Sequence, residues 1–127
     1  DGNVTAEDRR GWTVVLQGDQ VVPAESGQDP IGVVSAFPSV VGDSAWNHWK
    51  YRYLRSDFGD YLLDESGERV PNPTYDPEME YVAREDRVEW DCVGLLGKLR
   101  VRKGQPIGSR WIKMRDVSDQ VEEWLVR

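Results

Sequence analysis

Short apolar and β-branched runs, separated by turn residues, recur along most of the chain and predict strands. The runs at 12–16 and 20–24 flank a Gly-Asp pair, which predicts a hairpin. The run at 31–36 predicts another strand, and 37–46 predicts a strand and a turn because a proline and a glycine interrupt it. The segment 46–54 fits both helical and strand spacing, and we favour a strand since aromatic side chains suit half-buried pleated surfaces.

The segment 92–115 predicts two more strands joined by a turn. Leu99 and Val101 alternate with cationic residues, so apolar side chains lie on one face of the strand and charges on the other. The alternating cations are Lys98, Arg100 and Arg102. After glycine and proline residues typical of a turn, 110–114 returns as a strand.

The C-terminal residues 115–127 predict an amphipathic α-helix. Their apolar side chains have the spacing of one helical face, i, i+4, i+7 and i+8: Val117, Val121, Trp124 and Leu125. Asp116 or Ser118 can cap the first turn of this helix. Together these patterns predict a compact, mainly β domain of about seven or eight short strands with a C-terminal α-helix.

The length and composition fit one domain. The chain has 127 residues, 39% of them hydrophobic, and its six tryptophans supply large areas for a core or a subunit interface. We therefore expect a single domain over 1–127. Within it, 57–91 holds 12 acidic and 3 basic residues, and its part 64–86 carries three prolines and few aliphatic residues. We expect 64–86 to be a surface loop insertion.

Charge and residue usage exclude several classes of function. The net charge is −7, so we expect no general binding to nucleic acid, and no apolar run is long enough to span a membrane. The single cysteine, Cys92, cannot form an intrachain disulfide and is expected in the core. The only histidine, His48 near Ser44, lacks the pattern of a catalytic Ser-His pair or of a metal site. We expect no metal and no cofactor. The seven bases of 92–115 can bind an anion, such as a nucleotide phosphate or a surface carboxylate, but we favour pairing with the acids of 57–91.

The polar segment 1–11 is the candidate site of chemistry. Three carboxyl groups fall within eight residues, beside an amide and a guanidinium: Asp1, Asn3, Glu7, Asp8 and Arg9. Paired carboxyl groups can divide acid and base roles when their surroundings separate their pKa values. By spacing alone, a solvated acidic loop fits this segment as well.

Several stretches of the chain resemble one known family. They are DGNVTAEDRRGWTVVLQGDQVV, PIGVVSAFPSVVGDSAWNHW followed by KYRYLRSDFG, and VGLLGKLRVRKGQPIGSRWIKMRDVSDQVEEWLVR. The combination of Asp-Gly-Asn at 1–3, Glu-Asp-Arg at 7–9 and Gly-Val-Val-Ser at 32–35 is its most specific part. The chain resembles the intramolecular-chaperone autoproteolytic cleavage domain at the C-terminus of phage tailspikes and neck appendages. The segment 64–86 is the part least similar to that family.

The resemblance implies a chaperone that removes itself. The domain would promote trimerisation of the spike region upstream in the same polypeptide, and the homotrimer would then cut the bond preceding Asp1. A chain that begins at Asp1 without an initiator methionine is then the product of the cut. The implied setting is the host cytoplasm during virion assembly, where the domain is released from a precursor of a virion tail component. The activity is that of a single-turnover peptidase that acts only on its own chain.

Two routes for such a cut are open. The Asp1 carboxylate can attack the carbonyl preceding it and form an anhydride that water opens, a step that intramolecular geometry favours. Alternatively, Glu7 or Asp8 activates a water molecule. In either route one of these two acids protonates the leaving amine, and Asn3 or Arg9 stabilises the oxyanion. Dependence on the trimer follows if the acid comes from a neighbouring subunit, or if assembly desolvates the carboxyl groups.

Two other classes of function fit part of the same pattern. A receptor-binding or structural β domain at a phage fibre tip would stay attached and never cleave. The tryptophans and tyrosines also suit a small carbohydrate-binding module, although core and interface packing accounts for them as well. The fate of a longer precursor, cut or intact, distinguishes the fibre-tip domain from the self-cleaving one.

Overall fold

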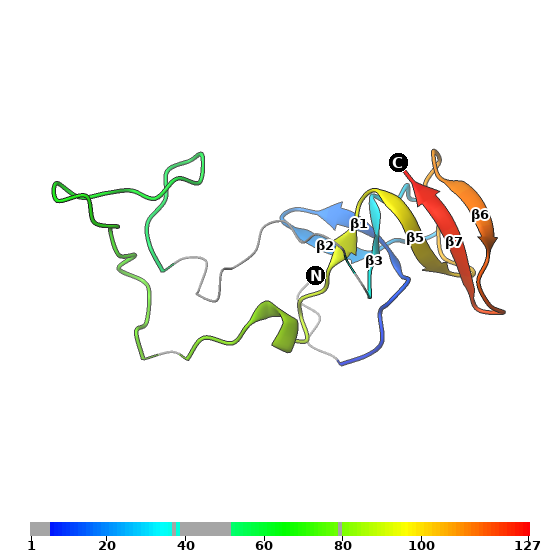
Figure 1. Cartoon of the computed structure of the whole chain (residues 1–127), viewed down its shortest axis with the longest axis horizontal. Helices are drawn as coiled ribbons and strands as arrows, with labels where there is room; N and C mark the ends of the chain where they lie inside the picture. Colours follow the sequence, from blue (N-terminus) through cyan, green and yellow to red (C-terminus); the bar gives the residue numbers. More distant parts are fainter. Residues whose placement is uncertain (1–5, 37, 39–51, 79) are drawn as a thin grey trace. The chain divides into compact units, whose positions relative to one another are not determined.

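The fold is described by a computed structural model, in which the described residues are 6–36, 38, 52–78 and 80–127 (Figure 1). The chain divides into two compact units, and the single domain expected over 1–127 stays a prediction. One unit consists of Asp1–Gly42 with Val88–Arg127, and the other is Asp43–Arg87. The first unit is therefore assembled from both ends of the sequence.

The described residues are mainly β, and every strand assigned to a sheet lies in the first unit. The strands are β1 (Thr13–Gln17), β2 (Gln20–Pro23), β3 (Gly32–Val34), β4 (Val93–Gly94), β5 (Gly97–Arg102), β6 (Ile112–Asp116) and β7 (Val121–Val126). They form a four-stranded sheet in the order β2-β1-β3-β4 and a three-stranded sheet in the order β5-β7-β6. All neighbouring strands are antiparallel.

The first sheet contains the predicted hairpin. In it Leu16 lies opposite Val21, and Gly18 and Asp19 form the two-residue turn. Gly18 has a φ angle of 64°, a left-handed conformation that glycine adopts at little cost. The strand predicted at 31–36 is also confirmed, because β3 forms within it and is buried along its length.

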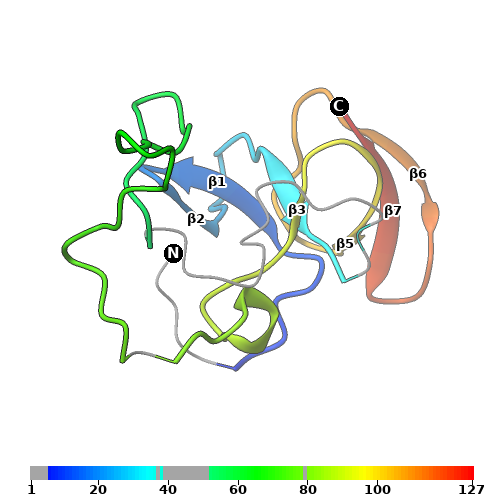
Figure 2. The same cartoon turned by 60° about the vertical axis from the view of Figure 1, so that its left-hand side comes forward.

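The second sheet contains the predicted alternating strand. In β5, Leu99 and Val101 face inward, and Val101 is only 1% exposed. Lys98 and Arg100 between them are exposed, which confirms the predicted separation of apolar and charged faces. Figure 2 shows β7 lying between β5 and β6.

One hydrophobic cluster contains residues of both sheets. Val33 of β3, Val101 of β5 and Val126 of β7 are each 1% exposed, and Trp111, just before β6, belongs to the same cluster. Partly buried apolar residues pack around them: Leu99, Ile107 and Trp124. Fully burying a valine side chain stabilises a fold by about 1.5–3 kcal/mol, so this cluster fixes the two sheets as one unit.

The helix predicted over 115–127 is wrong, because these residues form the end of β6, a turn and β7. Ser118 uses its hydroxyl oxygen to accept from the backbone N–H of Gln120 at 3.2 Å, so it makes a turn where we expected a helix cap. The apolar side chains of β7 suit a strand as well as a helix. Strand pairing on both sides of β7 then overrides the helical spacing.

In the described part of the chain, three cations of 92–115 pair with acidic residues of this C-terminal hairpin, where the sequence predicts partners in 57–91: Lys103, Lys113 and Arg115. Lys113 Nζ lies 3.0 Å from Asp116 and 3.2 Å from Glu122. Arg115 Nε lies 3.3 Å from Glu123 across the sheet. The two glutamates inside β7 thus serve as cross-strand partners, a role that helical spacing does not reveal.

Two further predictions concern single residues, Cys92 and His48. Cys92 is exposed, so its expected place in the core is wrong. It directly precedes β4, a two-residue strand at the edge of the first sheet, where no further strand covers the sheet in the described part of the chain. His48 and Ser44 lie outside the described residues, as do most of 37–46 and most of 46–54.

The second unit is held by stacked side chains in place of a strand core. Over its described residues, isolated bridges join Tyr53 to Pro71 and Arg55 to Tyr61, and a short 3-10 helix, η1 (Arg84–Asp86), lies near its end. Arg69 lies over the rings of Tyr53 and Tyr61, at 5.6 and 4.0 Å from their centroids. Such cation–π pairs each contribute about 0.5–1 kcal/mol at exposed sites. Most of the segment 64–86 is turn and irregular backbone in the described residues.

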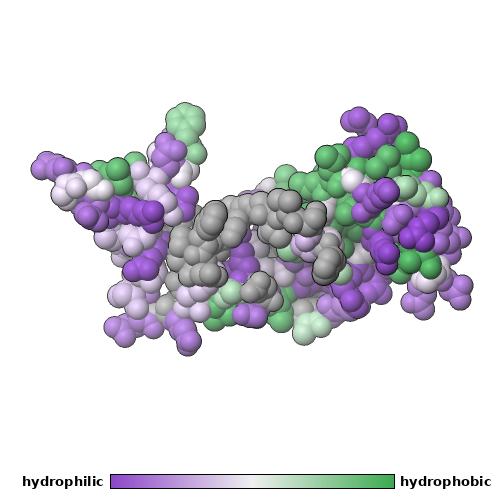
Figure 3. Space-filling model, viewed as in Figure 1, coloured by the Kyte–Doolittle hydropathy of each residue, from purple (hydrophilic) through white to green (hydrophobic). Residues whose placement is uncertain are grey.

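Apolar side chains also remain exposed on the first unit. They include Leu95, Leu96, Ile112 and Met114, which are 45 to 77% exposed. Figure 3 shows apolar and charged side chains side by side over the unit that carries the strands. Among the described residues, no helix has the length and apolar character needed to cross a membrane.

Candidate functional site

The chain enters the first unit through a tight turn that precedes β1. The backbone N–H of Trp12 donates to the carbonyl of Arg9 at 3.0 Å, and the N–H of Gly11 donates to the carbonyl of Val34 in β3 at 2.9 Å. Gly11 is buried with a φ angle of 81°. Because a Cβ at this position would lie 3.0 Å from Cγ of Arg102, glycine allows the turn to rest directly against β5.

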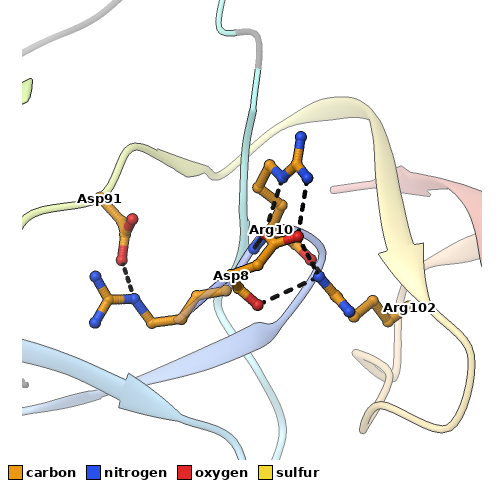
Figure 4. A network of polar contacts seen from close by, with 5 residues as sticks. Asp8, Arg10, Asp91 and Arg102 are labelled. Atoms are coloured by element: carbon orange, nitrogen blue, oxygen red, sulfur yellow. Dashed lines mark hydrogen bonds and ion pairs between the residues drawn. The ribbon is translucent and has the colours of Figure 1, made fainter. Parts of the chain in front are cut away.

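Arg102, the last residue of β5, holds this turn through several donors (Figure 4). Its Nε donates to the carbonyl of Arg10 at 2.6 Å, and its Nη2 donates to the carbonyl of Asp8 at 3.2 Å. Nη2 also lies 3.0 Å from the Asp8 carboxylate. The backbone N–H of Arg102 donates to the carbonyl of Gly11 at 3.0 Å. The residues 8–11 are therefore bound to β5 through backbone and side chain together.

Asp8 is clamped between two guanidinium groups. Arg10 Nε and Nη2 each donate to one Asp8 oxygen at 2.8 Å, a bidentate pair, and the Arg10 backbone N–H donates at 3.2 Å. These hydrogen bonds from Arg10, side chain first, hold the pKa of Asp8 well below its usual range, and the charge of Arg102 acts in the same direction. Asp8 is therefore an ionised anchor at any pH near neutrality.

Arg9 points the other way and is buried, with 9% of its side chain exposed. Its Nε lies 2.7 Å from Asp91, and its Nη2 donates to the carbonyl of Val88. Asp91 and Val88 lie where the chain re-enters the first unit after Arg87. Arg9 therefore joins the N-terminal segment to the returning chain, and the pair with Asp91 compensates the cost of burying its charge.

The structure brings together only part of the residue set that the sequence suggests. Glu7 is exposed beside Asp8, while Arg9 is turned into the unit. Asp1 and Asn3 lie outside the described residues. The described residues contain no group of three or more side chains suited to hold a metal ion.

Sequence reasoning missed three residues of this network, namely Arg10, Asp91 and Arg102. Arg102 was assigned to the charged face of its strand, but nothing local says that this face meets residues 8–11. The separation between Arg102 and Asp8 is 94 positions. The alternating basic strand was the available signal, because an unmatched cation at a strand end needs an acceptor.

The structure thus defines a two-sheet β unit in which buried and exposed arginines fix the segment 8–11. The sequence model of the Peptidase_G2 family, described as the IMC autoproteolytic cleavage domain, matches residues 1–124. The chain therefore belongs to this family of self-cleaving phage domains, and the resemblance found in the sequence is confirmed.

Known relatives and solved structures agree with this assignment. The chain is 38% identical over 101 residues to the pre-neck appendage protein of Bacillus phage B103, covering 72% of this chain and 12% of that protein. It thus spans about an eighth of that relative. The pre-mature bacteriophage phi29 gene product 12 has a similar fold, with a TM-score of 0.79, 27% identity and coverage of 93% of this chain and 19% of that one. For the C-terminal fragment of phi29 gene product 12, the TM-score is 0.71 at 27% identity, covering 93% and 91%.

Proposed function

We propose that this chain is the C-terminal chaperone domain of a phage appendage or tailspike, and that it releases itself by cutting the bond preceding Asp1. The family assignment supports self-cleavage. The observation that carries the proposal to this chain is the network that fixes residues 8–11 against β5. A peptide bond is cut by its own chain only when the adjacent segment is held in one geometry.

In this proposal the two neighbouring acids have different roles. Asp8 stays ionised because its pKa is lowered, so it anchors the segment and is a poor proton donor. Glu7, exposed beside it, carries the proton for the leaving amine of Asp1. Arg9 is engaged with Asp91 and the carbonyl of Val88, which makes it an anchor as well.

Two nucleophiles are consistent with this arrangement. In one route, the Asp1 carboxylate attacks the preceding carbonyl carbon, the amine of Asp1 leaves with a proton from Glu7, and water opens the resulting anhydride. In the other, water activated by Glu7 attacks the carbonyl directly and the amine again takes the proton. In both, Asn3 donates a hydrogen bond to the oxyanion.

The proposal includes assembly as a homotrimer with the upstream region of the same polypeptide. The exposed apolar residues Leu95, Leu96, Ile112 and Met114 supply surface for subunit contacts in this proposal. The solved C-terminal fragment of phi29 gene product 12 supports a separable domain of this span. The cut would occur in the host cytoplasm during virion assembly, before the appendage is complete.

A precursor that carries residues upstream of Asp1 tests this function. Mass spectrometry of the purified wild type should show a fragment that begins at Asp1, and Glu7→Gln should leave trimers uncut. Glu25→Gln, which alters an exposed glutamate in another loop of the same unit, is the matched control and should cut normally. A wild-type precursor that stays intact would exclude self-cleavage and support a structural domain at a fibre tip. Normal cutting by Glu7→Gln would remove Glu7 from the mechanism.

A further inference from the structure

The Arg102 side chain satisfies three acceptors in the segment 8–11 with two of its nitrogens. Nε serves the carbonyl of Arg10, while Nη2 serves the carbonyl and the carboxylate of Asp8. Two of these acceptors are backbone carbonyls, so the contacts fix the path of the main chain as well as one side chain. These contacts therefore set the position and direction of the main chain at Asp8.

Only a guanidinium fits this set of acceptors. Its N–H donors lie in a rigid plane and point at several acceptors at once, whereas a lysine presents one nitrogen on a flexible stem. The stem of Arg102 also matters, because its Cγ closes the space beside Gly11. Arg102 therefore shapes the turn through packing and through hydrogen bonds.

Arg102 is itself fixed by the second sheet. It is the last residue of β5 and lies opposite Val121 of β7. Its neighbour on the same face, Arg100, lies two residues earlier in the strand and is exposed, and it makes none of these contacts with the segment 8–11 among the described residues. Formation of the sheet thus decides whether Arg102 can reach residues 8–11.

We propose that Arg102 is the positioning residue of the self-cleavage reaction, which couples formation of the β5-β7-β6 sheet to placement of the cleavage segment. This inference rests on the proposed function. In this role Arg102 holds the segment in place and takes no part in the chemistry itself. It acts through Asp8 and the carbonyl of Arg10, from which the chain runs back through Glu7 to the bond preceding Asp1.

The test compares cleavage rates of full-length precursors that carry Arg102→Met, Arg102→Lys or Arg100→Met. Methionine keeps the stem against Gly11 and removes the donors, so we expect the rate to fall by about tenfold to a hundredfold. Lysine should restore part of the rate, because it retains one donor and the charge. Arg100→Met, the matched control on the same strand face, should cut like the wild type.

Rates are measured on the folded protein to separate positioning from stability. Addition of the osmolyte trimethylamine N-oxide raises the folded fraction, and it should leave the Arg102→Met rate low if the residue positions the segment. If Arg102→Met stays unfolded even then, Arg102→Lys provides the test. A slower cleavage rate, in a variant whose melting temperature equals that of the wild type, supports the role. A cleavage rate equal to that of the wild type overturns it.

A double variant tests whether the two residues act together on the cleavage rate, which a general loss of stability would not produce. Because Arg102 acts partly through Asp8, the combined effect of Asp8→Asn and Arg102→Met on the rate should be smaller than the product of their separate effects. Independent, multiplicative effects would contradict the proposal. The wild type separates the two proposals: an intact wild type refutes the proposed function, whereas a cut wild type with normal cutting by Arg102→Met refutes only the role of Arg102.

Discussion

The Nε of Arg102 donates to the carbonyl oxygen of Arg10 at 2.6 Å, and the two residues are 92 positions apart in the sequence. This bond joins the end of β5 to the turn that precedes β1. Both arginines also contact Asp8. Arg102 thus binds the carboxylate of Asp8 and the backbone carbonyls of Asp8 and Arg10, which joins two distant sequence segments of the first unit. These contacts fix the segment 8–11 within the first unit.

Asp8 should make stability depend on acid pH. Its pKa is lowered in the folded state from the ordinary value of 3.8, chiefly by hydrogen bonds from Arg10, so its stabilising effect is present above pH 3.8 and is lost as the pH falls toward the folded pKa. We expect Asp8→Asn to lower the melting temperature at pH 7 and to differ less from the wild type below pH 3.8. Thermal melts of both proteins across this range measure the difference. A gap that stays constant with pH would contradict the clamp.

Gly108 should be intolerant of a side chain. A Cβ at this position would lie 2.4 Å from Nε1 of Trp111, which belongs to the core cluster. We expect Gly108→Ala to lower the free energy of unfolding by about 1–3 kcal/mol through overpacking. Gly27→Ala is the control, because a methyl group at this position has room and only the φ angle of 88° disfavours it. It should cost about 1 kcal/mol. Urea unfolding of both variants decides.

Arg69 should stabilise the second unit alone. Replacing it with methionine removes its stacking over Tyr53 and Tyr61, and we expect a loss of about 1 kcal/mol within that unit. Amide hydrogen exchange measures the effect. The N–H of Leu62 and the N–H of Val70 bond within the unit and should exchange faster, while the β1 amides keep their rates. Equal acceleration in both units would show that Arg69 acts more widely.

The C-terminal strand should be required for the first unit to fold. Removing residues 121–127 deletes β7, which lies between β5 and β6, along with the buried Val126. We expect loss of cooperative unfolding in that unit and, under the proposed function, an uncut precursor. Removing Arg127 alone is the control. Circular dichroism and mass spectrometry report the two effects, and normal cutting without β7 would contradict them.

The parts of the fold that the sequence predicts are those determined by residues close to one another along the chain. A Gly-Asp turn between two apolar runs specifies the β1-β2 hairpin, and alternation of Leu99 and Val101 with cations specifies β5. The strand β7 was predicted as a helix because the spacing of the apolar residues in VEEWLV fits helical as well as strand periodicity. Its two glutamates occupy a central strand only because Lys113 and Arg115 lie beside them.

The candidate site follows the same division. Glu7, Asp8 and Arg9 are adjacent in the sequence and were predicted as site residues from their charges. The partners of Asp8 and Arg9 include residues of distant segments. Asp91 and Arg102 reach this group through sheet topology, which no spacing within residues 1–11 encodes. The roles of neighbouring acids could not be separated from sequence for the same reason, since the low pKa of Asp8 depends on how Arg10 and Arg102 are arranged.

The central place of β7 has a consequence for when the domain can act. β7 follows β5 and β6 in the sequence, so it is synthesised after them, and both strands depend on it for pairing. While residues 121–126 are still in the ribosomal exit tunnel, the second sheet cannot close and Arg102 lacks its fixed position. Under the proposed function, a nascent or truncated polypeptide therefore keeps its chaperone attached. Release would be confined to chains in which β7 has been synthesised and has paired.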